Sequence, residues 1–369
     1  MSGLPYRFGV IGGGWRSEYY LRLAKDLPDQ FEVTGLFSRN AQHREEVARR
    51  FGIPTAASMS EVATNADPDF VLIAVPARAA ANVTIELVSM GVRVLVETPP
   101  AFHLEEMRHL WTEVGPLRRV QVADQTIYMP SVQARRAIID SGVIGEPTSV
   151  HVSSNHQYHA VSMMRGLMRV GKGAATVNAR DFVSDLVDPI ITQNYTDNPE
   201  ATAHTTCLAT IDFGGGKSGL YDFTFLQWFN PLRQRRLLIR GTHGEIHDEK
   251  AIYMEDTRTV IESGIHRRQL GIDLNLEGYR LDNITFNGKA VYRNPFVGVS
   301  QSDEDIAAGE VVRRTALWAR GEGPAPYPLA DGLQDHHIGL AFAESAQSGH
   351  SVTTSVEEWS SAPSWFEES

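Results

Sequence analysis

The first 140 or so residues alternate short apolar runs with helix-like stretches, and this rhythm limits the fold more than any other feature. The apolar runs at 8–11, 31–37, 70–75 and 92–96 are predicted to be buried strands, with a further strand at 120–123. Helices are predicted over 16–26, 41–51 and 79–90, the last two ending at Gly52 and Gly91. Strands that alternate with helices form βαβ units on a parallel sheet. We therefore expect a doubly wound α/β domain here.

Beyond about residue 145 the pattern changes to strands joined by hairpin-like connections. Strands are predicted at 148–154, 204–213, 220–228, 235–240 and 251–255. A chain of 369 residues exceeds the length at which one hydrophobic core usually stops growing. We predict two domains: residues 1–124 with the parallel sheet, and residues 125–369 as an α+β domain with a large, mostly antiparallel open sheet. One face of that open sheet is a candidate interface for a homo-oligomer.

Charge and composition exclude several classes of partner and site. The formal net charge of -11 repels a polyanion, so no nucleic-acid partner is expected. Neither a secretory signal nor an apolar stretch long enough to cross a bilayer is apparent, so we expect a cytoplasmic protein without a membrane partner. Cys207 is the single cysteine and is expected to be a buried, inert thiol. No spacing of histidines and carboxylates predicts a metal site.

A glycine-rich turn joins the first predicted strand to the first helix. It reads Val10-Ile11-Gly12-Gly13-Gly14-Trp15-Arg16-Ser17. The first glycine allows the tight turn, Gly14 lets a pyrophosphate approach the backbone, and the helix start offers free N–H groups. Ser17 replaces the usual final glycine or alanine. The turn therefore predicts that residues 1–124 are a Rossmann dinucleotide-binding domain.

The end of the second strand bears on the choice between NAD and NADP. An NAD-binding domain usually has an acidic residue there for the ribose 2′-hydroxyl, whereas this strand ends Phe37-Ser38-Arg39-Asn40. A guanidinium pairs with a 2′-phosphate in a fork, so NADP is favoured. Alternatively, Arg39 stacks over adenine or lies in solvent, and NAD is then equally acceptable.

The order of motifs resembles that of the glucose-fructose oxidoreductase, inositol dehydrogenase and rhizopine-catabolism (Gfo/Idh/MocA) family over nearly the whole chain. The matching pieces are the glycine turn, Ile73-Ala74-Val75-Pro76, the run 91–99, the run 138–147 and the region 336–352. The resemblance implies an NAD(P)-dependent enzyme of sugars, sugar acids, cyclitols or polyols, often a dimer or tetramer. The cofactor-binding residues that we expect are Gly12, Gly13, Gly14, Trp15, Arg16, Ser38, Arg39, Val75, Pro76, Glu97 and Thr98.

The sequence departs from this family at the residue expected to be a catalytic lysine. The family's Glu-Lys-Pro, whose lysine reaches the nicotinamide and the substrate, is here Glu97-Thr98-Pro99. A threonine carries no positive charge, so another group must move the proton if the protein is an enzyme. The helical stretch with Asp and His four apart is also missing, and the run 155–165 stands in its place.

The run 155–165 supplies the main candidates for proton transfer and substrate contact. His159 is the first choice because histidine titrates near neutrality, and His156 would share its face on a helix. Arg165 is a candidate clamp for an acidic or hydroxyl-rich substrate. The remaining candidates, each with a packing role as the alternative, are Tyr128, Tyr158 and the pair His336 and His337.

Three functions are compatible with these patterns. The first is an oxidoreductase that transfers a hydride between a nicotinamide cofactor and a sugar, sugar acid or polyol. The second is a glycosidase that uses transient oxidation by the same cofactor. The third is a sensor or subunit that kept the nucleotide pocket but lost catalysis with the lysine. Fold alone does not choose among them.

Overall fold

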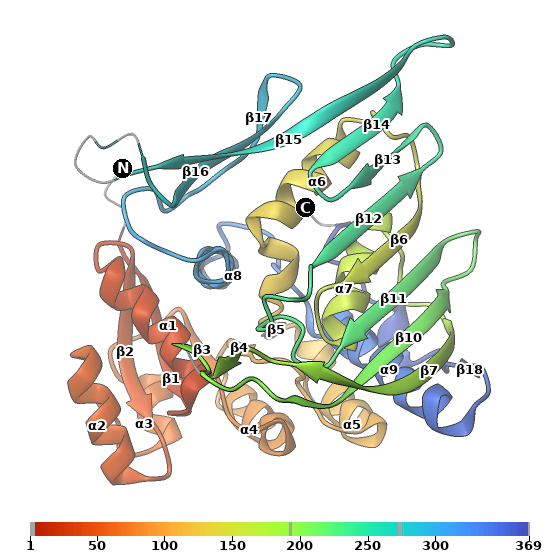
Figure 1. Cartoon of the computed structure of the whole chain (residues 1–369). Helices are drawn as coiled ribbons and strands as arrows, with labels where there is room; N and C mark the ends of the chain where they lie inside the picture. Colours follow the sequence, from red (N-terminus) through yellow and green to blue (C-terminus); the bar gives the residue numbers. More distant parts are fainter. Residues whose placement is uncertain (1–3, 192–193, 272–274, 276, 368–369) are drawn as a thin grey trace.

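The computed structural model describes residues 4–191, 194–271, 275 and 277–367, and it begins with a five-stranded parallel sheet (Figure 1). The strand order is β2-β1-β3-β4-β5. Every residue of β3 and β4 is buried, as expected for parallel strands with helices on both faces. The strands are β1 (Tyr6–Ile11), β2 (Phe31–Phe37), β3 (Phe70–Ile73), β4 (Val94–Val96) and β5 (Val120–Val122).

Five helices accompany this sheet, and the order of strands reverses direction between β1 and β3. A crevice at such a reversal is where open α/β sheets bind ligands. The predicted doubly wound fold is confirmed, although the prediction left out α3 and α5. The helices are α1 (Trp15–Asp26), α2 (Ala41–Phe51), α3 (Met59–Thr64), α4 (Ala77–Ser89) and α5 (Leu104–Val114).

The second half of the chain forms an eleven-stranded sheet, ordered β17-β16-β15-β14-β13-β12-β6-β11-β10-β7-β18. The pair β6–β11 is parallel and the others are antiparallel, which confirms the predicted sheet. Its strands are β6 (Pro147–Ser153), β7 (Thr176–Val187), β10 (Ala201–Asp212), β11 (Ser218–Thr224), β12 (Arg236–Gly241), β13 (Gly244–His247), β14 (Lys250–Met254), β15 (Val260–Leu270), β16 (Arg280–Phe286), β17 (Lys289–Arg293) and β18 (Val352–Thr353). A separate two-stranded sheet pairs β8 (Ile190–Ile191) with β9 (Asn194–Tyr195).

The strand predicted over 220–228 ends earlier than expected, at Thr224. The chain turns there because the Gln227 side chain points inward and donates to the carbonyl oxygens of Ser153 and Gln234, at 3.0 and 2.9 Å. The prediction also left out β7 and the long β15–β17 strands. Many residues of β7 and β15 are exposed, so they lack the apolar runs that mark the buried strands.

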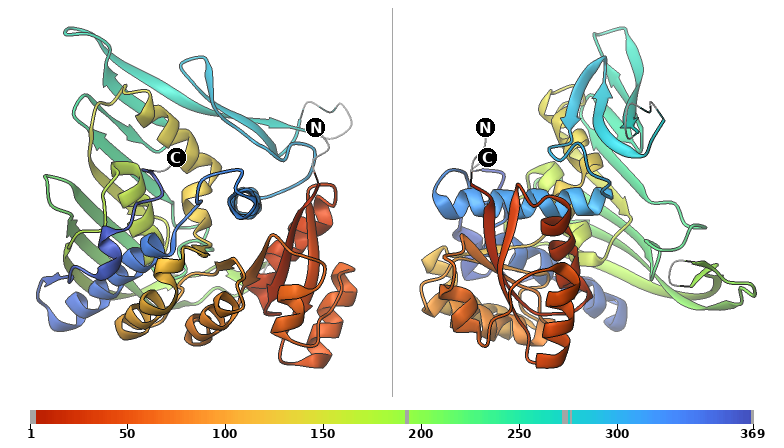
Figure 2. Two further views of the ribbon diagram at one scale, coloured as in Figure 1. Left: turned by 180° about the vertical axis from the view of Figure 1, so that it is seen from behind. Right: turned by 90° about the vertical axis from the view of Figure 1, so that its left-hand side faces the viewer.

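Helices α6 (Pro130–Asp140), α7 (Gln157–Met168) and α9 (Leu329–Ser348) cover one face of the large sheet, and Figures 1 and 2 show the other face open. Along β10 the side chains alternate between buried and exposed toward its end, as expected for a sheet covered on one side. The uncovered face exposes Leu208, Leu220 and Ile252 by 40–42%.

Helix α8 (Asp303–Arg320) lies far along the chain but packs against α1, β1 and β3. Arg320 ties it to the first domain through Asp69, with N–O distances of 2.7 and 2.8 Å. The domain boundary at residue 124 remains a prediction. After the second sheet the chain returns, in α8, to pack against the first domain. In the described ranges, no helix has the length and apolarity needed to cross a membrane.

Candidate active site

The glycine turn lies at the crevice between β1 and β3. Gly12 has a φ of 124°, and a Cβ there would stand 2.1 Å from the carbonyl oxygen of Ala74. Only glycine fits such a position. Gly14 precedes α1, which has no side-chain cap, and a Cβ on Gly14 would meet nothing within 4 Å. The free N–H groups and the open backbone therefore fit the pyrophosphate of a dinucleotide.

The end of β2 presents a hydroxyl and a guanidinium beside this turn. The amide of Gly12 donates to the Phe37 carbonyl at 2.8 Å, which brings the two strand ends together. Ser38 is half-buried and Arg39 is exposed. The first turn of α2 contains no acidic residue. This edge therefore offers a cation, and no carboxylate from the first turn of α2, to an adenosine ribose.

The remaining residues predicted around the turn lie at its rim. Val75 and Pro76 follow β3, and Pro76 immediately precedes α4. Trp15 is 70% exposed and stands edge-on to Tyr19, with ring centroids 5.8 Å apart. These positions all lie at the carboxyl edge of the sheet, where a dinucleotide is expected.

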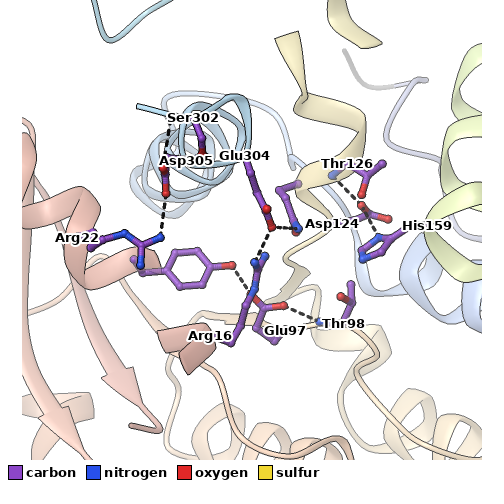
Figure 3. A network of polar contacts seen from close by, with 12 residues as sticks. Arg16, Arg22, Glu97, Thr98, Asp124, Thr126, His159, Ser302, Glu304 and Asp305 are labelled. Carbon is purple, nitrogen blue, oxygen red and sulfur yellow. Dashed lines mark hydrogen bonds and ion pairs between the residues drawn. The ribbon is translucent and has the colours of Figure 1, made fainter. Parts of the chain in front are cut away.

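Glu97 follows β4 and is the centre of a buried polar cluster (Figure 3). Arg16 Nε donates to Glu97 Oε1 at 2.6 Å, and the Tyr20 hydroxyl donates to the same oxygen. The amide of Thr98 donates to the other oxygen at 3.1 Å. Burial and the Glu97 charge raise the pKa of Tyr20 well above its ordinary value. Tyr20 therefore stays a neutral donor.

Arg16 also reaches a residue of α8. Its Nη1 donates to Glu304 Oε1 at 3.0 Å, and the Gln125 side-chain amide reaches the same oxygen at 3.4 Å. Burial opposes the charge of Arg16, yet Glu97 raises its pKa above the ordinary value. Arg16, which was predicted to bind the cofactor, is thus turned onto two carboxylates. It remains a permanent cation next to Thr98.

His159 and Asp124 form a second polar pair, opposite the Glu97 cluster (Figure 3). Asp124 follows β5 and is 1% exposed, and its Oδ1 lies 3.1 Å from His159 Nδ1. The amide of Thr126 donates to the same oxygen at 3.0 Å. Burial opposes the charge of Asp124, but the pairing with His159 and these donors lowers its pKa.

The carboxylate fixes the orientation of the His159 ring. Because an ionised Asp124 only accepts, a neutral His159 carries its proton on Nδ1. The described residues give Nε2 no hydrogen-bond partner, so this nitrogen is free to accept a proton. His159 is 9% exposed. The pair has the arrangement of a general base held by a carboxylate.

His156 lies just before α7 within a group of aromatic rings. Its ring centroid is 4.3 Å from that of Trp228 and 6.3 Å from that of His159. Burial lowers the pKa of His156 to about 4, and the nearby His159 adds to this effect. The helix does place the two histidines together, as predicted. His156 is neutral near pH 7 and forms an aromatic wall.

Tyr158 lies on α7, next to His159, and packs toward His336 on α9. Its ring centroid lies 4.5 Å from that of His159 and 5.8 Å from that of His336. Burial raises its pKa to about 12, an effect that the neighbouring Thr98 side chain reduces. His336 Nε2 contacts the Phe102 carbonyl at 3.1 Å. Tyr158 and His336 therefore border the site.

Three other candidates lie in packing environments. Arg165 is 1% exposed and donates to Asp335 Oδ1, Asp331 Oδ1 and the Gly171 carbonyl, at 2.6, 2.8 and 3.1 Å. Tyr128 donates to the Pro326 carbonyl at 2.7 Å. His337 is 6% exposed and stands edge-on to Trp359. Arg165 on α7, Tyr128 on η2 (Gln125–Tyr128) and His337 on α9 thus all face protein groups.

Sequence reasoning did not single out Asp124, Gln125 and Glu304. Asp124 and Gln125 directly follow the predicted strand 120–123. Their place at the carboxyl end of a parallel strand, where ligands bind, could have marked them as site residues. Glu304 had no such signal, because only the packing of α8 on α1 brings it to Arg16. Within the described ranges, no three His, Cys, Asp or Glu side chains converge to hold a metal ion.

Residues 6–122 match a family model described as "Oxidoreductase family, NAD-binding Rossmann fold". Over these residues the chain is similar to the Rossmann domain of the Gfo/Idh/MocA family. The chain is also 30% identical over 105 residues to the scyllo-inositol 2-dehydrogenase (NADP(+)) of Bacillus subtilis. That match covers 28% of this chain and 32% of the relative's length.

Solved structures similar to this one extend over both domains. An oxidoreductase from Agrobacterium radiobacter, in complex with NAD+, L-tartaric acid and magnesium, is 16% identical with a TM-score of 0.69, covering 94% of this chain and 98% of that one. A levoglucosan dehydrogenase in complex with NADH and levoglucosan is 20% identical with a TM-score of 0.67, covering 95% and 99%. A myo-inositol dehydrogenase from Corynebacterium glutamicum is 18% identical with a TM-score of 0.63, covering 95% and 99%. At these identities the likeness shows the fold alone.

Proposed function

We propose that the chain is an NAD(P)-dependent oxidoreductase that transfers a hydride between a nicotinamide cofactor and a sugar, sugar acid or polyol. The observation that carries this proposal is the His159–Asp124 pair, which leaves one imidazole nitrogen free beside Thr98 (Figure 3). The substrate class is supported by the relatives, since two are inositol dehydrogenases and one is a levoglucosan dehydrogenase.

The protein's own task in this reaction is to orient the substrate and move one proton. When bound, the nicotinamide ring supplies or accepts the hydride. During oxidation His159 Nε2 accepts the proton of the substrate hydroxyl, and Asp124 stabilises the resulting imidazolium. During reduction the same nitrogen returns a proton to the substrate. Help of this kind typically contributes about 100- to 10,000-fold in rate.

Arg16 supplies the positive charge at the edge where the family resemblance places a lysine. Thr98 is uncharged, whereas Arg16 is buried and paired with Glu97 and Glu304. Because both carboxylates hold it, Arg16 keeps a fixed position and cannot act as a base. A single lysine could supply both the positive charge and the proton transfer. In this proposal Arg16 supplies the charge and His159 transfers the proton.

The cofactor preferred by this site is NADP. Arg39 is exposed directly after Ser38, whose side chain lies against Gly13, and α2 brings no carboxylate to its first turn. The relative from Bacillus subtilis carries NADP(+) in its name, whereas two of the solved structures above contain NAD+ or NADH. Every assay therefore tests NAD alongside NADP.

The open face of the large sheet is the proposed contact between subunits. Leu208 and Leu220 are exposed there on the neighbouring strands β10 and β11, and Ile252 is exposed farther along the sheet, on β14. Apolar side chains on an uncovered sheet face mark interaction surfaces. We expect a dimer or tetramer in solution, and light scattering of the purified chain measures this directly.

A carbohydrate panel with both nucleotides tests the proposed activity. The purified chain is mixed with sugars, sugar acids, cyclitols and polyols, and nicotinamide absorbance is followed with NADP+ and with NAD+. Net reduction of the nucleotide by at least one compound is expected. Cleavage of a glycoside that requires the nucleotide but leaves it unreduced would instead support a redox glycosidase. Tight nucleotide binding without any turnover would support a sensor.

A further inference from the structure

A cavity lies near the His159–Asp124 pair, between η2, α6 and the start of β12. Its volume is about 150 Å³, whereas a single water needs roughly 10–15 Å³. Three arginines and one carboxylate line it, Arg135, Arg235, Arg236 and Asp248, together with residues such as Thr126, Asn155 and Met163. The cavity therefore has room for a chemical group larger than a water molecule, and positive side chains outnumber negative ones in its walls.

Arg135 is a buried cation whose charge is not balanced by an ion pair. It is 7% exposed, and it donates through its two terminal nitrogens to the backbone carbonyls of Ser131 and Asp248. Its Nε is buried without a hydrogen-bond partner. No carboxylate of the described residues lies within ion-pair distance of Arg135. Burying an unpaired charge is costly, so such a guanidinium calls for an anion.

The carboxylates around the cavity are already bonded elsewhere. Asp248 accepts from the Leu237 amide at 3.0 Å and lies 3.2 Å from His247. Asp222 pairs with Arg236 at 2.7 Å. Arg235 is exposed and donates to the Trp228 carbonyl at 2.9 Å. Two of the three arginines therefore lack a carboxylate partner among the described residues.

Two contacts join this cavity to the proposed reaction centre. Thr126 lines the cavity and donates its amide to Asp124, the partner of His159. Met163 lines it one helical turn after His159 on α7, and its sulfur lies 3.6 Å from the Asn155 amide nitrogen. The cavity thus lies next to residues that hold the His159–Asp124 pair in place, although neither member of the pair lines it.

We infer that this cavity binds an oxyanion carried by the substrate, either a phosphoryl group or a carboxylate. The inference rests on the proposed function and narrows its substrates to sugar phosphates or sugar acids. Arg135 and Arg235 hold the anion with charge-assisted hydrogen bonds, while His159 acts on a hydroxyl at the other end of the same molecule. Arginine is suited to this task because its planar fork matches both anions.

Binding of simple anions tests the cavity without any turnover. Inorganic phosphate and acetate are titrated into the wild-type chain by calorimetry and by thermal unfolding, at constant ionic strength. At least one is expected to bind and to raise the unfolding temperature. Arg235→Ala and Arg135→Lys should weaken that binding by about 10- to 100-fold, the effect of losing a charge-assisted hydrogen bond. Arg235 is exposed, so its replacement leaves the fold intact even if Arg135→Lys does not.

Arg233→Ala is the matched control, because it removes the same charge from the same loop outside the cavity lining. Equal losses in Arg233→Ala and Arg235→Ala would show that a diffuse field attracts the anion, and would overturn the inference. Failure of both anions to bind the wild-type chain would overturn it as well. These titrations measure neither nucleotide binding nor turnover, so the proposed function is tested separately by the carbohydrate panel.

Kinetics then distinguish the two anion sources. Matched neutral, carboxylated and phosphorylated forms of one sugar or polyol are compared with the same nucleotide. Arg235→Ala should raise KM about 10- to 100-fold for the preferred anionic form, with kcat nearly unchanged, and leave a neutral substrate unaffected. A preference for the carboxylated form identifies a sugar acid, and one for the phosphorylated form a sugar phosphate. Equal use of the neutral form would contradict the inference while supporting the oxidoreductase.

Discussion

Helix α7 carries His159 and Arg165 less than two turns apart, and the two differ in whether they can act on a ligand or only stabilise the fold. His159 bonds to Asp124 through one ring nitrogen and leaves the other free. Arg165 bonds through all three of its nitrogens to Asp331, Asp335 and Gly171. Both side chains are buried. A buried polar group with every partner supplied by the protein stabilises the fold, whereas one with a free atom facing the site can act on a ligand.

Replacing His159 is expected to have the largest effect on activity. His159→Gln keeps a hydrogen bond to Asp124 but accepts no proton, so turnover should fall about 100- to 10,000-fold. Nucleotide affinity, measured by fluorescence titration, should stay nearly unchanged. Thr98→Ala is the control at the same edge and should cost far less. Turnover of His159→Gln within a few-fold of wild type would remove this histidine from the mechanism and redirect attention to Tyr128, His156 or the pair His336 and His337.

Replacing Arg165 should show the opposite pattern, with stability lost first. Arg165→Met leaves Asp335 buried without its cation and Asp331 with only Lys172, 3.7 Å away, and breaking a buried pair in this way typically costs about 3–5 kcal/mol. The free energy of unfolding in urea measures this loss. Arg169→Met removes an arginine at the end of the same helix that is 58% exposed and pairs with Asp140. An exposed pair contributes roughly 0–1 kcal/mol. Similar stability in both variants would contradict the structural role of Arg165.

The same contrast divides two arginines of the Rossmann domain, Arg16 and Arg39. Arg16 is held by two carboxylates, whereas Arg39 is exposed at the end of β2. Arg39→Ala should weaken NADPH binding by about 10- to 100-fold and leave NADH nearly unchanged. Arg49→Ala, an exposed arginine on α2, is the control. Equal losses for both nucleotides would mean that Arg39 contacts adenine or a shared phosphate.

His156 offers a smaller test, through the dependence of stability on pH. Burial lowers its pKa to about 4, so between pH 6.5 and 4 the unfolded chain takes up a proton that the folded chain does not. Stability contributed by the neutral ring is therefore present above pH 6.5 and lost as the pH falls toward 4. His156→Phe should flatten this part of the curve of unfolding free energy against pH. His350→Phe, at an exposed position, should leave its slope as in wild type.

The sequence predicted the parts of the site that depend on local pattern. The glycine turn and the strand ends lie in or next to the predicted segments, because hydrophobic period and glycine position act over a few residues. For the run 155–165 the sequence left open a helix or a strand end, and the structure has α7 there. The partners of these residues were harder to predict. Asp124 meets His159 across 35 positions and Arg16 meets Glu304 across 288 positions, so no local pattern contains either pair.

The sequence by itself determined a Rossmann domain, a mostly antiparallel second sheet and the absence of a lysine at Thr98. It left open which of several histidines, tyrosines and arginines face the nucleotide edge, since each has the right chemistry. In the part of the chain that the structure describes, tertiary contacts surround Arg165 and Tyr128 with protein acceptors and give His159 Nε2 none, and our proposal rests on this difference. The physical reason is that burial makes every polar atom depend on its neighbours, and those neighbours come from distant parts of the chain.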